Sequence, residues 1–301
     1  MEQSYYLTMQ DGTKLYVKQW NPTIKPVGII QIAHGMAEHI SRYQYFAEYF
    51  IDKGFVVLGN DHRGHGKTGE KHVQGFFADA DGNAIVVQDL YEVMQVTMNQ
   101  YPSLPYFFVG HSMGSFLMRN FIQKYSNCID GLILTGTGHY PRLTSFSGRT
   151  IASLLPPHEK SNLMNYLAFG NSNRRIPSPA HKYSWLTRDL EQAEAYENDP
   201  QSGFIPTARF FYDLLDSINT MLDPKLNRNI RKDLPLLLLS GDKDPIGQHG
   251  KGIWKTANLY SKFGVDNITI SVFDDGRHEL LNDICKHEAF TLINSWLKAY
   301  L

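Results

Sequence analysis

The chain has few cysteines and no excess of either charge, and each shortage disfavours a class of protein. Its 301 residues include two cysteines, and 29 Lys and Arg against 30 Asp and Glu leave a net charge of −1. Cys128 and Cys285 are too few for a disulfide framework, so we expect a reducing compartment and two small core thiols. The chain has no excess of Lys and Arg with which to neutralise the phosphates of a nucleic acid, which argues against a nucleic-acid partner.

Long apolar runs are also missing. The longest, residues 27–33 and 236–239, fall far short of the ~20 residues that span a bilayer, and they have the length of buried strands. Glu2 stands where a secretory signal would carry basic charge, and no apolar segment of the required length follows it. We therefore expect a soluble, cytoplasmic protein.

Short β-branched or aromatic runs alternate with longer segments of helical period over most of the chain. Asp11-Gly12 separates the first two runs, a strong hairpin signal because this pair tolerates positive φ. Nearly continuous apolar strands that alternate with amphipathic helices are typical of a parallel sheet covered on both faces, so we predict an α/β fold. The predicted strands are 5–9, 14–20, 27–33, 55–58, 106–109, 132–135, 236–239 and 268–273, and the predicted helices are 43–53, 84–101, 115–125, 253–263 and 284–301.

Residues 138–223 interrupt this alternation with a proline-rich segment that is otherwise helical in pattern. So long a run without strands is better explained as a helical cap than as a loop, inserted into one core made of residues 1–137 and 224–301. The best cap helix is expected to start near Pro206, a residue suited to a first helical turn. Its apolar stripe, which fits core packing and pocket lining equally well, comprises Phe211, Leu214, Leu215, Ile218 and Leu222.

The segment Gly110-His111-Ser112-Met113-Gly114 matches the G-x-S-x-G pattern. The pattern alone is weak, but here a predicted strand precedes it and a predicted helix follows it. That context indicates a nucleophile elbow, in which small flanking residues allow a sharp turn and the serine Oγ projects from the end of the sheet. The amide of Met113, at the helix start, points toward the same place. The alternative is a tight turn with an idle serine.

A serine hydroxyl needs a base, and the base needs a group that orients it. His278 follows a predicted strand near the C-terminus, whereas His287 falls inside the last predicted helix. Asp242 and Asp244 both follow the strand 236–239, and we favour Asp244 because Pro245 restricts its backbone to an extended form. Ser, Asp, His is the chain order of one of the known triad arrangements.

Ester chemistry also needs donors for the developing oxyanion. Gly35 follows a buried strand in the sequence Ala33-His34-Gly35-Met36, and its lack of a side chain would let the backbone of Met36 approach the serine. We propose the backbone amides of Met36 and Met113 as the two donors, because removing one such donor typically costs roughly 3 to 4 kcal/mol in the chemical step.

Two cofactor interpretations fail. Gly66-Lys67-Thr68 resembles the end of a phosphate loop, but Asp61 stands where that loop needs glycine. His34, His39, His62 and His65 lie in two loops without the cysteines or helical spacing of a metal site, so we expect each to form hydrogen bonds within its own loop. We predict no cofactor and no metal.

Five motifs in the core together resemble the α/β-hydrolases of the monoacylglycerol lipase and lysophospholipase group. They are HGMAEHISRY (34–43), NDHRGHGKTG (60–69), GHSMGS (110–115), SGDKDPIG (240–247) and GRHELLND (276–283). In the cap, NRRIPSP (173–179) and YENDPQSGF (196–204) look like the bacterial lysophospholipase-like members.

This resemblance implies the α/β-hydrolase fold with a helical cap. It also implies Ser112 as nucleophile, Asp244 as acid, His278 as base, and the amides of Met36 and Met113 as the oxyanion donors. The resemblance implies that NDHRGHG (60–66) is a structural loop beside the site. We therefore expect a serine ester hydrolase that acts on a small-molecule acyl ester, such as a monoacylglycerol or a lysophospholipid, with at most transient contact between the cap and a membrane surface.

Two other functions compete with this prediction. A proline-iminopeptidase-type peptidase would need cap carboxylates to hold a free amine, for which Glu191, Glu194, Glu197 and Asp199 are candidates, although a solvated helix face explains them better. A catalytically silent binding protein of the same fold would have no reason to keep all three triad groups. A dehalogenase is disfavoured because its nucleophile is a carboxylate and position 112 is serine.

Overall fold

The chain is built around one sheet of eight strands in the order β1-β2-β4-β3-β5-β6-β7-β8. The structure is a computed structural model that describes residues 1–176 and 179–301, so Pro177 and Ser178 of the NRRIPSP motif lie outside the described residues. The strands are β1 (Glu2–Thr8), β2 (Lys14–Trp20), β3 (Gly28–Ala33), β4 (Phe55–Asn60), β5 (Tyr106–His111), β6 (Gly131–Thr135), β7 (Leu236–Gly241) and β8 (Ile268–Phe273).

The predicted parallel sheet is confirmed. β4, β3, β5, β6, β7 and β8 pair in parallel, whereas β1 and β2 form the predicted antiparallel pair, and β2 joins β4 antiparallel. The central strands are buried along their whole length, as expected for strands covered on both faces. Because the strands are parallel, the loops that follow β3, β5, β7 and β8 leave the sheet at the same edge.

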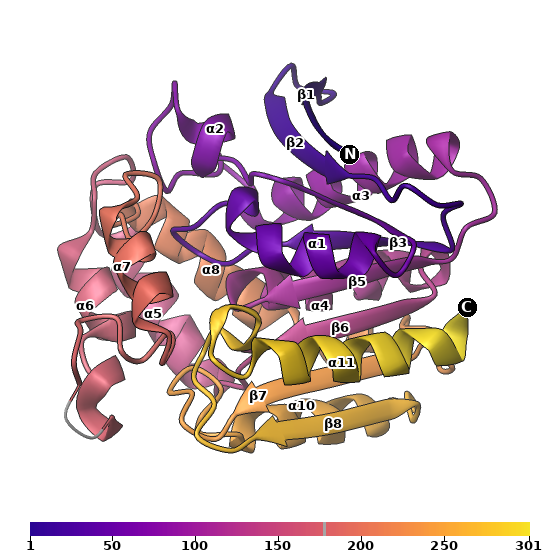
Figure 1. Cartoon of the computed structure of the whole chain (residues 1–301). Helices are drawn as coiled ribbons and strands as arrows, with labels where there is room; N and C mark the ends of the chain where they lie inside the picture. The colour runs from indigo at the N-terminus through magenta and orange to yellow at the C-terminus, as the bar shows by residue number, and fades with distance from the viewer. Residues whose placement is uncertain (177–178) are drawn as a thin grey trace.

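Helices cover both faces of the sheet (Figure 1). α1 and α11 pack on one face in a cluster that includes Phe46 and Phe290. α3, α4 and α10 pack on the other face in a cluster that includes Leu90, Phe121 and Tyr260. The α-helices are α1 (Gln44–Ile51), α2 (Gly66–Gly69), α3 (Gly82–Gln100), α4 (Met113–Tyr125), α5 (Arg142–Ser153), α6 (Asn162–Phe169), α7 (Leu190–Asn198), α8 (Ala208–Thr220), α9 (Pro224–Asn227), α10 (Lys251–Ser261) and α11 (Lys286–Leu297).

Short 3₁₀ turns complete the elements. They are η1 (Ile40–Tyr43), η2 (Ser126–Cys128), η3 (Ser172–Arg175), η4 (Leu280–Asn282) and η5 (Lys298–Tyr300). η1 leads into α1, and η4 lies in the loop between β8 and α11.

Between β6 and β7 the described chain forms only helices and turns, apart from one isolated bridge that pairs Lys160 with Thr207. We call residues 138–223 the cap, with the boundaries that the sequence predicts. In Figure 1 the cap helices α5 to α8 lie together beside one end of the sheet. α5 packs on α8, where Gly148 lies close to Leu215.

The predicted start of the best cap helix is wrong by two residues. α8 begins at Ala208, and its N-cap is Thr207, whose Oγ1 accepts a hydrogen bond from the amide of Phe210. Pro206 therefore precedes the cap residue instead of occupying the first turn. With Pro206 at the first helical position the N-cap residue would be Ile205, which has no side-chain oxygen, whereas Thr207 as N-cap accepts a hydrogen bond from the helix, which explains the shift.

The two cysteines are half-buried and free, so the prediction that both are core residues is only partly right. Cys128 packs at the edge of the α3/α4 cluster and Cys285 at the edge of the α1/α11 cluster. In the described residues, none of the helices has both the length and the apolar composition needed to cross a membrane.

The Thr207 hydroxyl stabilises the fold through two hydrogen bonds, because it also donates to the carbonyl of Gly75 at 2.7 Å while the side chain is fully buried. We expect Thr207→Ala to lower the free energy of unfolding by about 1 to 2 kcal/mol, as measured by urea denaturation. Thr207→Ser keeps the hydroxyl and should lose much less. Equal losses in the two variants would contradict this role.

Candidate active site

Ser112 lies at the sharp turn between β5 and α4. Its backbone has φ +51 and ψ −117, a conformation that is strained for a residue with a side chain. The turn is tight because Gly114 packs directly on β3, where a Cβ would lie 1.9 Å from the carbonyl oxygen of Ala33. The amide of Ser112 donates to the carbonyl of Thr135 on β6. The predicted strand–turn–helix context of the motif is therefore present, and it holds the serine side chain at the end of the sheet.

The structure brings three predicted residues into one chain of hydrogen bonds. His278 Nε2 lies 2.8 Å from Ser112 Oγ, and His278 Nδ1 lies 2.9 Å from Asp244 Oδ1. His278 comes from the loop after β8 and Asp244 from the loop after β7. In the sequence Asp244 is 34 positions and Ser112 is 166 positions from His278, yet the three residues meet at one edge of the sheet. We call this arrangement the Ser112–His278–Asp244 chain.

Burial and charge act in opposite directions on the two ionisable groups of this chain. Burial alone would lower the pKa of His278, but the charge and hydrogen bond of Asp244 raise it above its ordinary value. Burial alone would raise the pKa of Asp244, but His278 and the amide of Ile246 lower it. Asp244 is therefore charged at neutral pH and favours the protonated form of His278.

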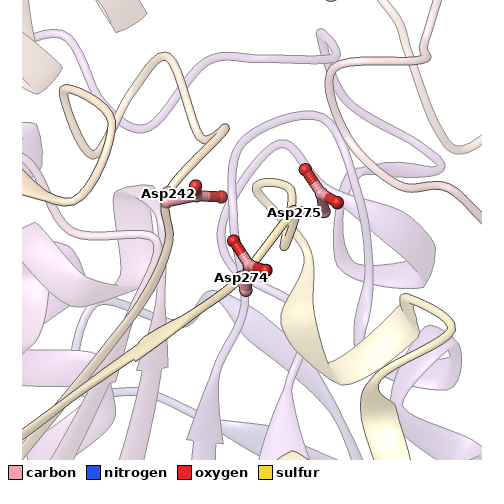
Figure 2. Close-up of side chains that lie close together, drawn as sticks. All are labelled: Asp242, Asp274 and Asp275. Carbon is pink, nitrogen blue, oxygen red and sulfur yellow. The ribbon is translucent and has the colours of Figure 1, made fainter.

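Asp242, the other predicted acid, faces away from this chain. Its Oδ2 pairs with the Lys243 ammonium at 2.5 Å. Figure 2 shows its side chain beside those of Asp274 and Asp275, on the loops that follow β7 and β8. These three carboxylates are half-buried or exposed, and Lys243 pairs with two of them, Asp242 and Asp275.

The two predicted oxyanion donors come from the start of the helix that follows Ser112 and from the loop after β3. Met113 is the first residue of α4, so its amide has no acceptor within the helix. The loop after β3 reaches the serine through Gly35, where a Cβ would lie 3.4 Å from Ser112 Cβ. The Gly35 amide donates to Glu38 Oε1 at 2.5 Å, which fixes the loop that carries Met36. Met36 and Ser112 line the same cavity.

A buried charge cluster lies behind this loop, and the sequence analysis missed it. The Arg42 guanidinium donates to Glu38 at 2.7 Å and to both oxygens of Glu279 at 2.7 and 2.8 Å. Tyr43 donates to Glu38 Oε1 at 2.9 Å. The spacing of Glu38 and Arg42 in HGMAEHISRY is a local signal, but their partner Glu279 is 237 positions from Arg42. The cluster connects the loop of Met36 to the residue next to His278.

The four loop histidines make hydrogen bonds with other groups of the protein. His34 accepts from the amide of His62 and has a ring nitrogen beside the carbonyl of Gly35, and His65 has one beside the carbonyl of Arg63. Burial lowers the pKa of His62 to about 3 and that of His65 to about 4, so both are neutral at pH 7. The expected bonding within the loops is wrong for two of the histidines. His62 Nε2 lies 3.2 Å from the carbonyl of His34 in the other loop, and His39 Nε2 lies 2.5 Å from Asp199 Oδ2 in the cap.

A cavity of about 300 Å³ lies between the cap and the Ser112–His278–Asp244 chain. Ser112, His278 and Met36 form part of its wall. The rest of the described lining combines aromatic, aliphatic and small residues with several polar side chains. The first group is Phe169, Tyr166, Trp185, Leu186, Tyr183, Tyr196, Phe204, Gly35, Ala37, Gly170 and Gly203, and the polar group is Asn162, Asn165, Lys182, His111, Glu38 and Glu279. The predicted stripe of α8 does not line this cavity and instead packs against α5 and the core.

The cap carboxylates that a peptidase would need do not line this cavity either. Glu191 and Glu194 are exposed, Glu197 pairs with His181 and Lys182, and Asp199 pairs with His39. The carboxylates that do line the cavity are Glu38 and Glu279, and Arg42 already neutralises one charge of the pair.

The ion pair with Arg42 makes Glu279 a source of pH-dependent stability. Burial alone would raise the pKa of Glu279, but Arg42 lowers it to about 2, from an ordinary value of 4.5. The pKa of Glu279 is lower in the folded protein than in the unfolded chain. The contribution of the ion pair to the free energy of unfolding is therefore present above pH 4.5 and is lost as the pH falls toward 2. We expect Glu279→Gln to flatten the acid limb of the unfolding free energy in this window, as measured by urea denaturation at each pH.

The exposed residue Glu288 provides the matched control. Glu288→Gln should leave the acid limb as steep as in the wild type. An acid limb of unchanged slope in Glu279→Gln would show that the ion pair does not hold Glu279 in its charged form.

Comparison with known proteins identifies the family of the chain. Residues 24–284 match the family described as serine aminopeptidase, S33. The monoacylglycerol lipase of Mycolicibacterium smegmatis is 26% identical over 294 residues, which cover 96% of this chain and 95% of that protein. The human monoglyceride lipase is 26% identical over 306 residues, which cover 97% of this chain and 89% of that protein.

Solved structures give the same fold. A thermostable carboxyl esterase from Bacillus coagulans, crystallised with glycerol, is 28% identical and superposes with a TM-score of 0.91 over 99% of this chain and 98% of that one. A soluble variant of the monoglyceride lipase from Saccharomyces cerevisiae has a TM-score of 0.78 at 19% identity, over 98% of this chain and 94% of that one. Since the family match spans most of the sequence, the chain belongs to the serine aminopeptidase S33 family and is an α/β-hydrolase similar to monoacylglycerol lipases.

Proposed function

We propose that the protein is a serine carboxylic-ester hydrolase that acts on single-chain acyl esters through an acyl-enzyme intermediate. The observation that carries this proposal is the Ser112–His278–Asp244 chain, with contacts of 2.8 and 2.9 Å at the wall of the cavity. The similarity to monoacylglycerol lipases and to a carboxyl esterase supports ester hydrolysis as the reaction class.

In this mechanism Ser112 Oγ attacks the ester carbonyl while its proton moves to His278 Nε2. The amides of Met36 and Met113 stabilise the oxyanion of the tetrahedral intermediate. His278 then protonates the alcohol oxygen, which leaves, and Ser112 remains acylated. A water molecule gives its proton to His278 and attacks the acyl carbonyl, and the return of that proton to Ser112 Oγ releases the acid. Asp244 keeps the proton of neutral His278 on Nδ1 and stabilises the imidazolium that forms twice in each cycle.

The walls of the cavity support an acyl chain as the part of the substrate that is bound. Aromatic side chains such as Phe169, Trp185 and Phe204 offer apolar contact for a hydrocarbon tail. Polar groups are fewer and include Asn162, Asn165 and Lys182, which suit a small polar head group. A monoacylglycerol or a lysophospholipid combines these two parts.

The peptidase alternative is less favoured, although the family description names an aminopeptidase. A free amine of a peptide substrate needs a carboxylate that is not already hydrogen-bonded to a cationic side chain. Within the described lining, Glu38 and Glu279 already bind Arg42, and the cap carboxylates lie outside the cavity. A silent binding protein is less favoured because it has no use for a strained serine hydrogen-bonded to a buried histidine.

Labelling with a fluorophosphonate probe tests the nucleophile. We expect the wild type to react at one site and Ser112→Ala to lose both the labelling and the hydrolysis of short-chain 4-nitrophenyl esters, because no other group would accept the phosphonyl. Ser147→Ala is the control, since Ser147 is exposed on α5, and it should label like the wild type. Labelling that persists in Ser112→Ala would remove the proposal.

The role of the acid is tested by comparing Asp244→Asn with Asp242→Asn. An asparagine at position 244 would favour the wrong tautomer of His278, and we expect kcat to fall by about 10⁴-fold. Asp242 contacts Lys243 instead of His278, so Asp242→Asn should stay within a few-fold of the wild type. Similar losses in the two variants, measured with a 4-nitrophenyl ester, would argue against Asp244 as the partner of His278.

A further inference from the structure

One cap segment runs along the loop that carries His278. We call residues 184–189 the strap. The amide of His278 donates to the carbonyl of Trp185 at 3.3 Å, and the amide of Glu279 donates to the carbonyl of Leu186 at 2.8 Å. The backbone of the candidate base is thus paired with the cap, in addition to the contacts of its side chain with the core.

Polar side chains hold the strap along the rest of this loop. Thr187 Oγ1 donates to the carbonyl of Asn282 at 2.9 Å. Arg188 Nε lies 3.0 Å from Oδ1 of the fully buried Asp283, and Lys286 Nζ lies 3.0 Å from Oδ2 of Asp189. These ion pairs and hydrogen bonds fix the position of Trp185 relative to His278.

The indole of Trp185 lies against the imidazole of His278. The ring centroids are 5.3 Å apart and the planes are inclined by 32°. Phe169 stacks on the indole at 5.6 Å and 23°, so the indole is itself supported within the cap. From the core, Gly136 packs against the same imidazole, where a Cβ would lie 2.8 Å from His278 Cε1. The imidazole is therefore confined by both the cap and the core.

The charge state of the imidazole makes this contact relevant to chemistry. His278 would become an imidazolium each time it takes a proton, and a cation within about 6 Å of an indole centroid is attracted to the ring face. The attraction is stronger where water is excluded, and His278 is 2% exposed. The neutral imidazole gains much less from the same contact, so the indole favours the charged form.

We propose that Trp185 is a positioning residue of the cap, whose carbonyl and indole orient His278 toward Ser112 and whose ring face stabilises the imidazolium. This inference rests on the proposed hydrolase function for its effect on turnover. The effect of Trp185 on His278 itself does not depend on the hydrolase function, because the contact exists in the resting protein.

Other charged and titratable groups also face His278. They are Asp244 from the loop after β7, His111 from the end of β5, Glu38 from the loop after β3, and Glu279, which Arg42 binds. Their net effect raises the pKa of His278 above 6.5. None of these groups changes when Trp185 is replaced, so a difference between variants reports the indole.

The test compares Trp185→Leu and Trp185→Phe with the wild type in the pH dependence of kcat/KM for a 4-nitrophenyl ester. The base must be neutral, so kcat/KM should rise with pH, and in the wild type the midpoint should lie above 6.5. Leucine keeps the site apolar but removes the ring face, and the midpoint should fall by about 0.4 to 1.5 pH units. Trp185→Phe should shift it less, because phenylalanine keeps a weaker ring face and also covers the case in which the leucine variant folds poorly.

Phe204→Leu is the matched control, because Phe204 is another aromatic residue of the same cavity wall. This variant is expected to change KM and to leave the midpoint where it is. If Trp185→Leu changes only KM, or moves the midpoint upward, Trp185 is a cavity wall and the proposal is wrong.

Titration of His278 by NMR in ¹⁵N-histidine-labelled protein separates this inference from the proposed function. A lower His278 pKa in Trp185→Leu supports the indole contact even if no ester is hydrolysed. Ester turnover with an unchanged His278 pKa in both variants supports the hydrolase and overturns the role of Trp185.

Discussion

The site depends on one imidazole being held in one orientation. His278 contacts Ser112 through Nε2 and Asp244 through Nδ1, and each contact fixes what the other can do. In the proposed mechanism the carboxylate of Asp244 keeps a proton on Nδ1, which leaves Nε2 as the acceptor for the serine hydroxyl. A small rotation of the imidazole ring would break both hydrogen bonds. The strands, the loops and the cap each restrain the position of this ring.

The parallel sheet supplies the first restraints. Because β5, β7 and β8 point the same way, their loops bring Ser112, Asp244 and His278 to one edge although the residues are far apart in the sequence. The close approach of Gly114 to β3 holds Ser112 in its strained conformation, and strain of this kind persists only where the surrounding packing imposes it. The buried cluster of Glu38, Arg42 and Glu279 then ties the loop of Met36 to the loop of His278.

Local signals in the sequence predicted the strands, the elbow and the three members of the Ser112–His278–Asp244 chain. These features depend on patterns within about ten residues, such as an apolar run followed by a glycine-flanked serine. The pairing of His39 with Asp199 and of Arg42 with Glu279 could not be predicted in this way, because the partners are 160 and 237 positions apart. The preference for Asp244 over Asp242 depended on one local signal, the restriction that Pro245 places on the backbone of Asp244. Only the turn geometry decides which carboxylate reaches the histidine.

The central claim is that Ser112 carries the acyl group during ester hydrolysis, and the most direct test is to trap that intermediate. The enzyme is mixed with excess 4-nitrophenyl ester, quenched in acid within the first turnover and analysed by intact mass and peptide mapping. The account predicts a burst of one nitrophenol per active site and one acyl group on the peptide that contains Ser112. Steady turnover without an acylated peptide, or an acyl group on another residue, would contradict it.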